Sequence, residues 1–432
     1  MSSFGYIVLL RKNRNFRSLW IGQVISELGD WFNNIAGLAL AMHLTGSGLV
    51  VTAVLLSRTV PVVIFGPLAG VMTDRFSRRT VLLAADYIRA VLALGFLLVT
   101  SRDRMWMAYL FSSLLTAVSI FFTTAKTSTI PEICGTQQLM PANALAGSTT
   151  AIVQTVGGAL GGIATHWLGY RTAFIINAVS FLLSAVLIYQ IRFQARSGLP
   201  REKATETTPA FAREFREGMS FIWSNPIILG LLLIGMGWAT GGGAAQILFS
   251  IFAVDVYRAG DQGIGLLYSA AGLGIVIGAS LANWFFRNKS FAVTKWVIGT
   301  SMVLTGIFYS IFSFTHSLWS GFFWITLSRV VMGINHIIGM TLLMNTVPAN
   351  LRGRTFSTKE TVVIFTMVLS MLLAGVGQHY TGPRTIALIA GVLTFLTGAI
   401  WLGANLAGVY KDSEVSSAQT EMEAASVGVE KT

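Results

Sequence analysis

The chain has 432 residues, of which 53% are hydrophobic and only 11% are charged, and its mean hydropathy is +0.67. Soluble globular proteins carry about 25% charged residues, so this composition excludes an ordinary soluble domain and predicts that most of the chain lies in lipid. The net charge of +12 does not indicate a nucleic-acid partner, because the basic residues lie between apolar runs rather than on one soluble module. The single cysteine, Cys134, excludes a disulfide framework and a cysteine zinc site, and we expect no metal and no cofactor.

Twelve apolar runs are long enough to cross a bilayer as helices, since about 20 residues span the hydrocarbon. The first run is too long for a signal-peptide core and lacks a small-residue cleavage pattern, so we expect it to remain as helix 1. The short connections predict that neighbouring helices are antiparallel. The predicted spans are 16–44, 49–72, 80–101, 106–127, 144–168, 172–192, 226–252, 262–286, 292–314, 318–346, 356–379 and 384–409.

One long polar stretch, 192–225, separates the runs into two sets of six. After Pro209 its phenylalanines and arginines are spaced as in an amphipathic helix that lies on the inner membrane surface. The last residues are rich in Glu, Ser and Ala, which is typical of a disordered tail. The predicted parts are a six-helix bundle at 1–191, a cytoplasmic linker at 192–225, a second six-helix bundle at 226–410 and a tail at 411–432.

A weak internal repeat relates the two sets of helices. Ser128-Thr-Ile-Pro131 closes the fourth predicted helix, and Asn345-Thr-Val-Pro348 closes the tenth. Membrane proteins built from two parallel six-helix repeats leave such echoes. We therefore predict an all-α membrane protein with twelve transmembrane helices in two pseudo-symmetric six-helix bundles.

Lysine and arginine residues fix the orientation. With the N-terminus inside, 22 of them fall on the cytoplasmic side and 5 on the opposite side. Cytoplasmic loops carry an excess of Lys and Arg. The pattern predicts that both termini lie in the cytoplasm.

The inner end of the second predicted helix reads Gly-Val-Met-Thr-Asp-Arg-Phe-Ser-Arg-Arg between Gly70 and Arg79. This string resembles the helix 2–3 loop signature of the Major Facilitator Superfamily of secondary transporters, although Ser77 stands where that signature usually has glycine. The resemblance implies a gating motif, in which Asp74 meets the N-terminus of helix 11 through the helix dipole. The motif residues are Gly70, Asp74, Arg75, Arg78 and Arg79, and for the arginines alone a purely topological role is the simpler interpretation.

Further stretches resemble the branch of that superfamily that contains macrolide-efflux proteins and the enterobactin exporter. They are Ser26–Trp31 in helix 1, Asp86–Arg89 in helix 3 and the connections around Pro131 and Pro348. The chain lacks the mid-helix arginine that the larger drug:proton antiporter branches place in helix 4. Helix 5 carries Gly157–Gly162, which is similar to the antiporter motif without its proline. Export by antiport is the function that this resemblance favours.

Six ionisable groups lie inside the predicted spans away from the residues near their ends, and there a charge costs about 2.5–3.5 kcal/mol or more unless it faces a cavity or a partner. They are Glu27, Asp30, Asp86, Arg58, Arg89 and Arg329. Glu27 and Asp30 are three residues apart and share a face of helix 1. We expect one of them, with Asp30 preferred by the family pattern, to exchange a proton against substrate. The alternative is a structural pair with Arg58 or Arg329. Arg329 on helix 10 could instead line the central cavity and take part in the coupling of proton and substrate movement.

The other intramembrane charges favour structural roles. Arg58 precedes Pro61 in helix 2, and we expect it to form an internal ion pair. Asp86 and Arg89 are spaced i, i+3 on helix 3 and most simply pair with each other.

Three uncharged or weakly basic residues are candidates for cavity polar groups: Gln246 on helix 7, and Asn335 and His336 on helix 10. Each could hydrogen-bond a ligand, and each could equally be an interhelical polar contact, which is the commoner use.

No nucleotide-binding loop and no catalytic motif of a protease or hydrolase is present, so we do not expect an enzyme. The leading hypothesis is a proton-coupled exporter of an amphipathic small molecule, such as a drug, a macrolide or a siderophore, that works by rocking alternating access. Lipid or metabolite transport and a non-transporting membrane sensor are the alternatives. The expected partners are a small-molecule substrate, protons and the lipid bilayer, and we expect a monomer in a bacterial-type inner membrane.

Overall fold

The computed structural model describes residues 9–191, 209–286, 289–348 and 351–410, and the predicted tail at 411–432 therefore lies outside the described residues. Helices account for nearly all of this part of the chain, and it contains no strand. The long helices are α2 (Arg14–Thr45), α3 (Gly48–Arg75), α4 (Arg78–Gly95), α5 (Met105–Tyr189), α6 (Pro209–Ser224), α7 (Pro226–Ile251), α8 (Gly260–Phe285), α9 (Phe291–Ser313), α10 (Leu318–Thr346), α11 (Arg352–Thr381) and α12 (Pro383–Leu406).

The predicted fold class is confirmed, with one difference in how the helices are joined. Three predicted spans run together as the 85-residue α5, which is interrupted only at Gly135 and Gly169. Both glycines have positive φ, 63° and 79°, a conformation that ends a right-handed helix and that residues with a Cβ rarely adopt. With these two breaks, every one of the twelve predicted spans corresponds to a helix.

Ten helical segments of the described residues are long and apolar enough to cross a membrane, and α2 is not among them. The middle of α2 carries Gln23, Glu27, Asp30, Asn33 and Asn34, which lower its apolar character. It nevertheless packs along α5, and half of its residues are buried. A helix this polar within a membrane protein marks the place where polar chemistry is concentrated.

Local chemistry explains where two of the helices begin. Asn13 precedes α2 and accepts a hydrogen bond from the Phe16 amide at 2.9 Å, and Ser77 precedes α4 and accepts one from the Thr80 amide at 3.1 Å. These side chains satisfy amides that a helix start leaves free. Ser77 has a φ of −66°, so its position does not require glycine, and serine adds a cap that glycine could not supply.

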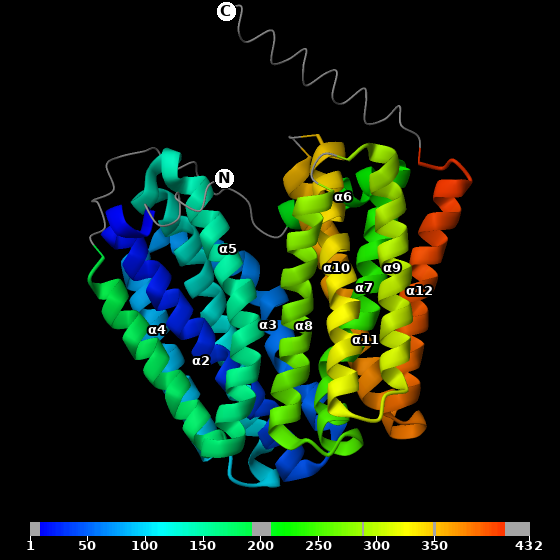
Figure 1. Cartoon of the computed structure of the whole chain (residues 1–432). Helices are drawn as coiled ribbons and strands as arrows, with labels where there is room; N and C mark the ends of the chain where they lie inside the picture. The colour runs from blue at the N-terminus through cyan, green and yellow to red at the C-terminus, as the bar shows by residue number, and fades with distance from the viewer. Residues whose placement is uncertain (1–8, 192–208, 287–288, 349–350, 411–432) are drawn as a thin grey trace, which may run out of the picture. The chain divides into compact units, whose positions relative to one another are not determined.

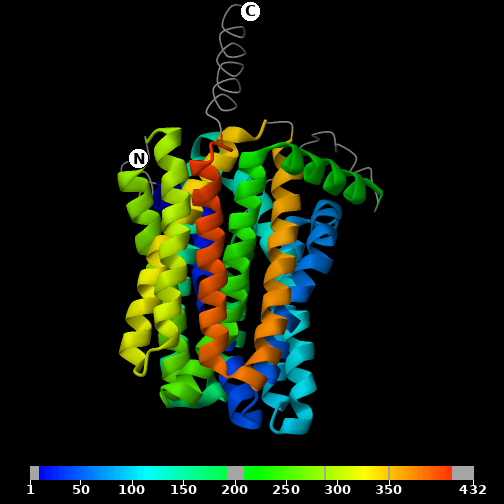
Figure 2. The ribbon, with the colours of Figure 1, turned by 90° about the vertical axis from the view of Figure 1, so that its right-hand side faces the viewer.

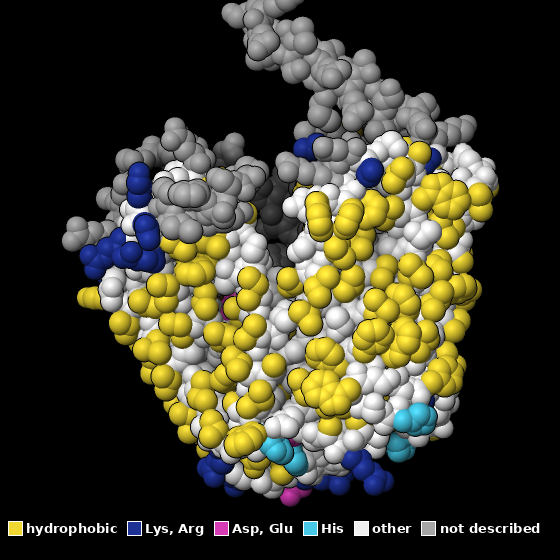
Figure 3. Space-filling view, viewed as in Figure 1, with side chains coloured by type: hydrophobic (Ala, Val, Ile, Leu, Met, Phe, Trp, Pro, Cys, Tyr) yellow, Lys and Arg dark blue, Asp and Glu magenta, His cyan; other side chains and the backbone are white. Residues whose placement is uncertain are grey.

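The chain forms two compact units, which we describe separately. Unit 1 contains the described residues up to 191 together with Gln246–Gly272 and His316–Leu318, and unit 2 contains the remaining described residues from 209 onward. In unit 1, α2, α3 and α4 pack on α5; in unit 2, α12 packs on α9, and α6 lies against α11 (Figures 1 and 2). On the face shown in Figure 3, hydrophobic side chains cover the middle of the helices and Lys and Arg gather near their ends.

Within unit 1, the first half of α8 crosses α5 at very close range. A methyl group added at Gly265 would approach Gly162 Cα to 2.7 Å and the Gly158 carbonyl oxygen to 2.5 Å. Only backbone meets backbone here, which is how small residues bring membrane helices together. The crossing gives the Gly157–Gly162 stretch a packing role, and it holds Tyr268 of α8 beside α2, with its ring 6.0 Å from that of Trp31.

Candidate functional site

The polar face of α2 meets charged residues from three other helices of unit 1. Glu27 Oε1 accepts hydrogen bonds from Gln23 Nε2 at 2.8 Å and from the Thr150 hydroxyl at 3.3 Å, and it lies 3.5 Å from Lys126 Nζ. The other oxygen, Oε2, is buried and has no hydrogen-bond partner among the described residues. About one fifth of the Glu27 side chain is exposed. The Glu27 carboxylate is therefore held through Oε1 alone, and its Oε2 accepts no hydrogen bond within the described residues.

Asp30, one turn further along α2, is more enclosed. Its Oδ1 is buried and lacks a hydrogen-bond partner within the described part of the chain. The strongest attractions that act on it come from Arg89 first and Arg58 second, and Glu27 and Asp86 repel it. No ion pair within 4 Å joins Asp30 to either arginine across the described ranges. The Asp30 carboxylate is thus influenced by several nearby charges and forms no direct ion pair with either arginine in the described part of the chain.

Asp86 and Arg89 of α4 form a buried ion pair. Arg89 donates to Asp86 Oδ1, and both side chains are almost wholly buried. The Arg89 guanidinium also stacks on two rings of α5, 3.9 Å from the centre of Phe122 and 4.4 Å from that of Phe181. Aromatic faces attract cations, so Arg89 is fixed from two sides while it acts on Asp30 over a longer distance.

Arg58 of α3 makes its direct contact with a neutral partner. It donates a hydrogen bond to the side-chain oxygen of Asn34 on α2, and it attracts the Asp30 carboxylate over a longer distance. The expected internal ion pair of Arg58 is therefore not a direct one in this structure.

Lys126 is a member of this group that sequence reasoning missed. We counted it with the basic residues of the cytoplasmic side, because it lies one residue before the predicted end of the fourth span at 127. The helix instead continues to Gly135, which places Lys126 within α5 and next to Glu27. The available signal was a lysine that directly follows the uncharged stretch 105–125 within a predicted span. Three acids, Glu27, Asp30 and Asp86, now meet three bases, Arg58, Arg89 and Lys126.

Arg329, the third predicted coupling residue, belongs to α10 in unit 2. It is 7% exposed, donates to Met332 Sδ at 3.0 Å and lies 5.9 Å from the centre of the Tyr309 ring. It borders a small hollow whose lining includes Trp238, Gly242 and Thr394. These two contacts are with a polarisable sulfur and an aromatic ring of its own unit.

The three candidate cavity polar residues lie in different surroundings. Asn335 donates to the Ile298 carbonyl at 2.8 Å and to the Ser301 hydroxyl at 2.9 Å, and so joins α10 to α9. His336 is exposed within its unit, near Lys359 and Glu360. The Gln246 carbonyl accepts a hydrogen bond from the Tyr268 hydroxyl at 2.8 Å. Asn335 thus joins two helices through its side chain and Gln246 through its backbone carbonyl, whereas the side chain of His336 is exposed.

The predicted gating motif is described only in part. Gly70, Asp74 and Arg75 belong to the last turns of α3, where side chains lie outside the described part of the structure. Arg78 forms an ion pair with Glu132 at 2.6 Å, and Arg79 donates to the Tyr189 carbonyl at 2.8 Å. Both arginines fasten α4 to α5 within unit 1, and the proposed meeting of Asp74 with helix 11 stays a prediction.

Metal chemistry finds no support in the described ranges, because no group of three or more His, Cys, Asp or Glu side chains gathers there. The site is a set of charged and amide side chains along α2, and side chains of these kinds can form ion pairs and can take up or release protons.

Comparisons with known proteins agree with this fold. The chain is 26% identical over 417 residues to an uncharacterised MFS-type transporter, YfiS, of Bacillus subtilis, which covers 91% of this chain and 94% of the relative. It is 21% identical over 388 residues to macrolide efflux protein A of Streptococcus pyogenes, with 88% and 93% covered.

A solved structure of a bacterial homologue of the human lysosomal transporter Spinster superposes with a TM-score of 0.70 at 15% identity, covering 94% of this chain and 98% of that one. This likeness shows the fold alone. A model of the transmembrane secretion effector family, a family of MFS transporters, matches residues 9–431. The chain therefore belongs to the transmembrane secretion effector family of the Major Facilitator Superfamily, whose members are membrane transporters.

Proposed function

We propose that this protein is a proton-coupled exporter that exchanges protons for an amphipathic small molecule, of the kind represented by drugs, macrolides or siderophores. The observation that carries the proposal is the pair of carboxylates on α2. Glu27 and Asp30 each keep one buried oxygen without a hydrogen-bond partner in the described part of the protein.

A buried oxygen without a donor is costly while the carboxylate is charged, and a proton on it removes the charge. The six charges around α2 balance, three acids against three bases. Uptake of one proton leaves this group with a net positive charge, and its release restores balance. A carboxylate whose neighbours change between two states of a transporter can therefore load a proton in one state and lose it in the other.

The same carboxylates would also govern the substrate. A ligand that approaches Glu27 or Asp30 competes with the proton for the negative charge, and mutually exclusive occupancy is the basis of antiport. The family membership supports transport, and the name of the macrolide efflux relative supports export as the direction. We propose rocking of two bundles as the means of alternating access.

The surrounding assignments are proposals of the same kind. The distribution of Lys and Arg supports a bacterial-type inner membrane location with both termini in the cytoplasm. We propose a monomer as the transporting species, with Arg329 contributing from unit 2.

The test is transport by the purified protein in liposomes with an imposed pH gradient. The probes are radiolabelled erythromycin, ethidium and enterobactin, and a pH-sensitive dye inside the liposomes reports proton movement. We expect at least one probe to move only with the gradient, and the dye to report proton flow in the opposite direction. The variants Asp30→Asn and Glu27→Gln separate the carboxylates, and the one that carries the proton should lose gradient-driven transport.

Asp103→Asn is the matched control, because Asp103 is an exposed carboxylate of unit 1 that is remote in sequence from the α2 group. It should transport like the unaltered protein. Probe movement that is indifferent to the pH gradient, or that survives replacement of both α2 carboxylates, contradicts the proposed coupling.

A further inference from the structure

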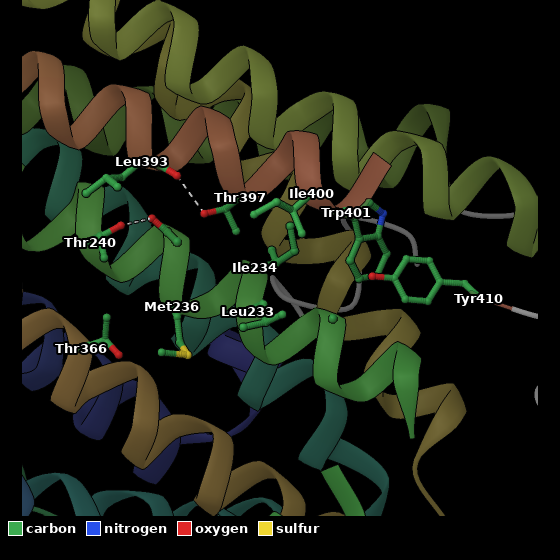
Figure 4. Close-up of a pocket in the computed structure, with 12 residues that line it drawn as sticks. Leu233, Ile234, Met236, Thr240, Thr366, Leu393, Thr397, Ile400, Trp401 and Tyr410 are labelled. Atoms are coloured by element: carbon green, nitrogen blue, oxygen red, sulfur yellow. Dashed lines mark hydrogen bonds between the residues drawn. The ribbon is translucent and has the colours of Figure 1, made fainter. Parts of the chain in front are cut away.

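Unit 2 contains a cavity of about 230 Å³ between α7, α11 and α12, away from the charges described above. Figure 4 shows Leu233, Ile234 and Met236 of α7 on one side, Ile400 and Trp401 of α12 on another, and Thr366 of α11 opposite them. α12 packs mainly on α9 and makes few contacts with α11. The cavity lies where these two helices and α7 come together.

The wall of this cavity offers almost no free polar group. Three threonines line it, and each hydroxyl donates within its own helix: Thr240 to the Gly237 carbonyl at 2.8 Å, Thr366 to Val362 at 2.8 Å and Thr397 to Leu393 at 2.9 Å. The hydroxyl protons are thereby used within the helices, and most of the remaining wall is aliphatic or aromatic. The cavity therefore offers an occupant mainly apolar contacts.

The cavity opens on the exposed surface of its unit. Leu233, Leu393 and Ile400 line it and are 43%, 45% and 65% exposed, whereas Ile234 and Trp401 behind them are 5% and 2% exposed. All five belong to helices that are long and apolar enough to span the membrane. An opening framed by exposed aliphatic side chains on such helices suits hydrocarbon, and the cavity leads inward to buried side chains.

Size and shape favour a chain over a compact molecule. Drug-sized ligands occupy pockets of roughly 300–1,000 Å³, which is more than this cavity holds. Its α7 wall extends from Gly230 to Thr240, which is about 15 Å along the helix at 1.5 Å per residue. At one end the rings of Trp401 and Tyr410 close it, with centroids 4.5 Å apart. Trp and Tyr are the residues that mark the membrane interface.

We propose that this cavity binds one acyl chain of a membrane phospholipid, lying along α7 between α11 and α12. Transfer of a chain from the bilayer brings no hydrophobic gain, because both surroundings are apolar. The gain comes from dispersion contacts between the chain and the side chains that line the cavity. The bound chain would act as part of the packing of unit 2, and it does not depend on the proposed proton coupling.

The experiment uses the full-length protein in nanodiscs of phosphatidylglycerol and phosphatidylcholine that contain a small fraction of phosphatidylcholine with a diazirine in the middle of one acyl chain. Irradiation followed by peptide mass spectrometry locates the adducts. Bulk lipid labels Leu233, Leu393 and Ile400 whether or not the cavity is filled. The informative positions are Ile234 and Trp401, which a chain reaches only from inside, and we expect adducts on both.

Two filling variants and one control decide the origin of these adducts. Thr397→Phe fills the cavity from α12 and Thr366→Phe fills it from α11; each should reduce labelling of Ile234 and Trp401 several-fold. Leu396→Phe places the same side chain on a lipid-facing position of α12 that does not line the cavity, and labelling should remain. Folding is checked by thermal unfolding in detergent, and agreement of the two filling variants guards against misfolding of either.

Two results would overturn the proposal. One is labelling confined to Leu233, Leu393 and Ile400, with none at Ile234 or Trp401. The other is labelling of the inner residues that a photoreactive macrolide displaces at low concentration, which would identify the cavity as a site for the transported molecule rather than for a lipid chain.

Discussion

Lys126 and Glu27 are 99 residues apart in the chain, and Lys126 Nζ lies 3.5 Å from Glu27 Oε1. The two side chains are 12% and 22% exposed, so the pair is partly screened but not free in water. This ion pair joins α2 to α5 at the point where α2 is most polar. It also makes Lys126 the cation that competes most directly with a proton for Glu27.

Replacement of Lys126 should therefore change the pH dependence of transport. In Lys126→Gln the carboxylate of Glu27 keeps Gln23 and Thr150 as partners but loses its nearest positive charge. Because its nearest positive charge is lost, the charged form of the Glu27 carboxylate is less stabilised, and the dependence of gradient-driven transport on pH should differ from that of the unaltered protein. The measurement is the initial rate of gradient-driven probe transport in liposomes between pH 5 and 9.

Lys126→Arg keeps the charge and should keep the pH profile. An unchanged profile in Lys126→Gln would show that Glu27 does not carry the transported proton, and would leave Asp30 as the coupling residue.

The buried pair of Asp86 and Arg89 predicts a separation of stability from transport. Arg89→Leu leaves the Asp86 carboxylate buried without its cation, and loss of one partner of a buried pair costs about 3–5 kcal/mol. The double variant Asp86→Leu with Arg89→Leu leaves no unpaired charge and should recover most of that loss. Thermal unfolding in detergent micelles measures both.

The double variant should still transport poorly, because it removes the strongest attraction that acts on Asp30. Arg104→Leu is the matched control, since Arg104 is an exposed arginine of unit 1 that belongs neither to the charged group around α2 nor to the predicted gating motif. Full transport by a stable double variant would mean that Arg89 only supports the fold.

Hydropathy alone was sufficient to predict the helices, because lipid requires long apolar segments whose backbone groups are satisfied internally. The breaks at Gly135 and Gly169 lie within the predicted gaps at 128–143 and 169–171. The helical residues on either side of Gly135 were not predicted, because 128–143 is more polar than the runs beside it and hydropathy alone assigns such a stretch to a loop.

The candidate site could be predicted by residue but not by partner. Glu27, Asp30, Arg58, Asp86 and Arg89 stand out because charges are rare in apolar runs. Their contacts depend on which faces of α2, α3 and α4 meet α5, and this is set by packing over the whole unit. The Asn34 bond to Arg58 and the Phe122 and Phe181 rings around Arg89 follow from that packing, and single-sequence periodicity carries no record of it.

Substitutions at two neighbouring residues of α6 should weaken its packing against α11, one more strongly than the other. Glu217 accepts from Arg354 at 2.5 Å, and each side chain is 41% exposed, so Glu217→Gln should cost no more than about 1 kcal/mol. Gly218→Leu should cost more, because even its Cβ would lie 2.7 Å from the Arg354 carbonyl oxygen.

Hydrogen exchange of the α6 amides is the measurement. Exchange should be fastest in Gly218→Leu, slower in Glu217→Gln and slowest in the unaltered protein. Salt should accelerate exchange in the unaltered protein and have little further effect in Glu217→Gln. Faster exchange in Glu217→Gln than in Gly218→Leu would mean that the ion pair, rather than the close approach at Gly218, holds α6 against α11.

The crossing of α8 over α5 should tolerate no added atom. In Gly265→Ala the new methyl group meets the Gly162 Cα and the Gly158 carbonyl, neither of which can rotate away as a side chain would. Overpacking of this kind costs about 1–3 kcal/mol, against a gain of about 1 kcal/mol from replacing glycine in a helix. The net effect should destabilise unit 1 and move Tyr268 away from Trp31, which lowers the unfolding temperature and slows probe transport.

Gly147→Ala is the matched control, because a methyl group at Gly147 meets no atom within 4 Å and only the stabilisation from replacing a helical glycine remains. Equal unfolding temperatures for the two alanine variants would mean that α8 can shift along α5 without loss, and that the close approach of their backbones does not fix the position of Tyr268.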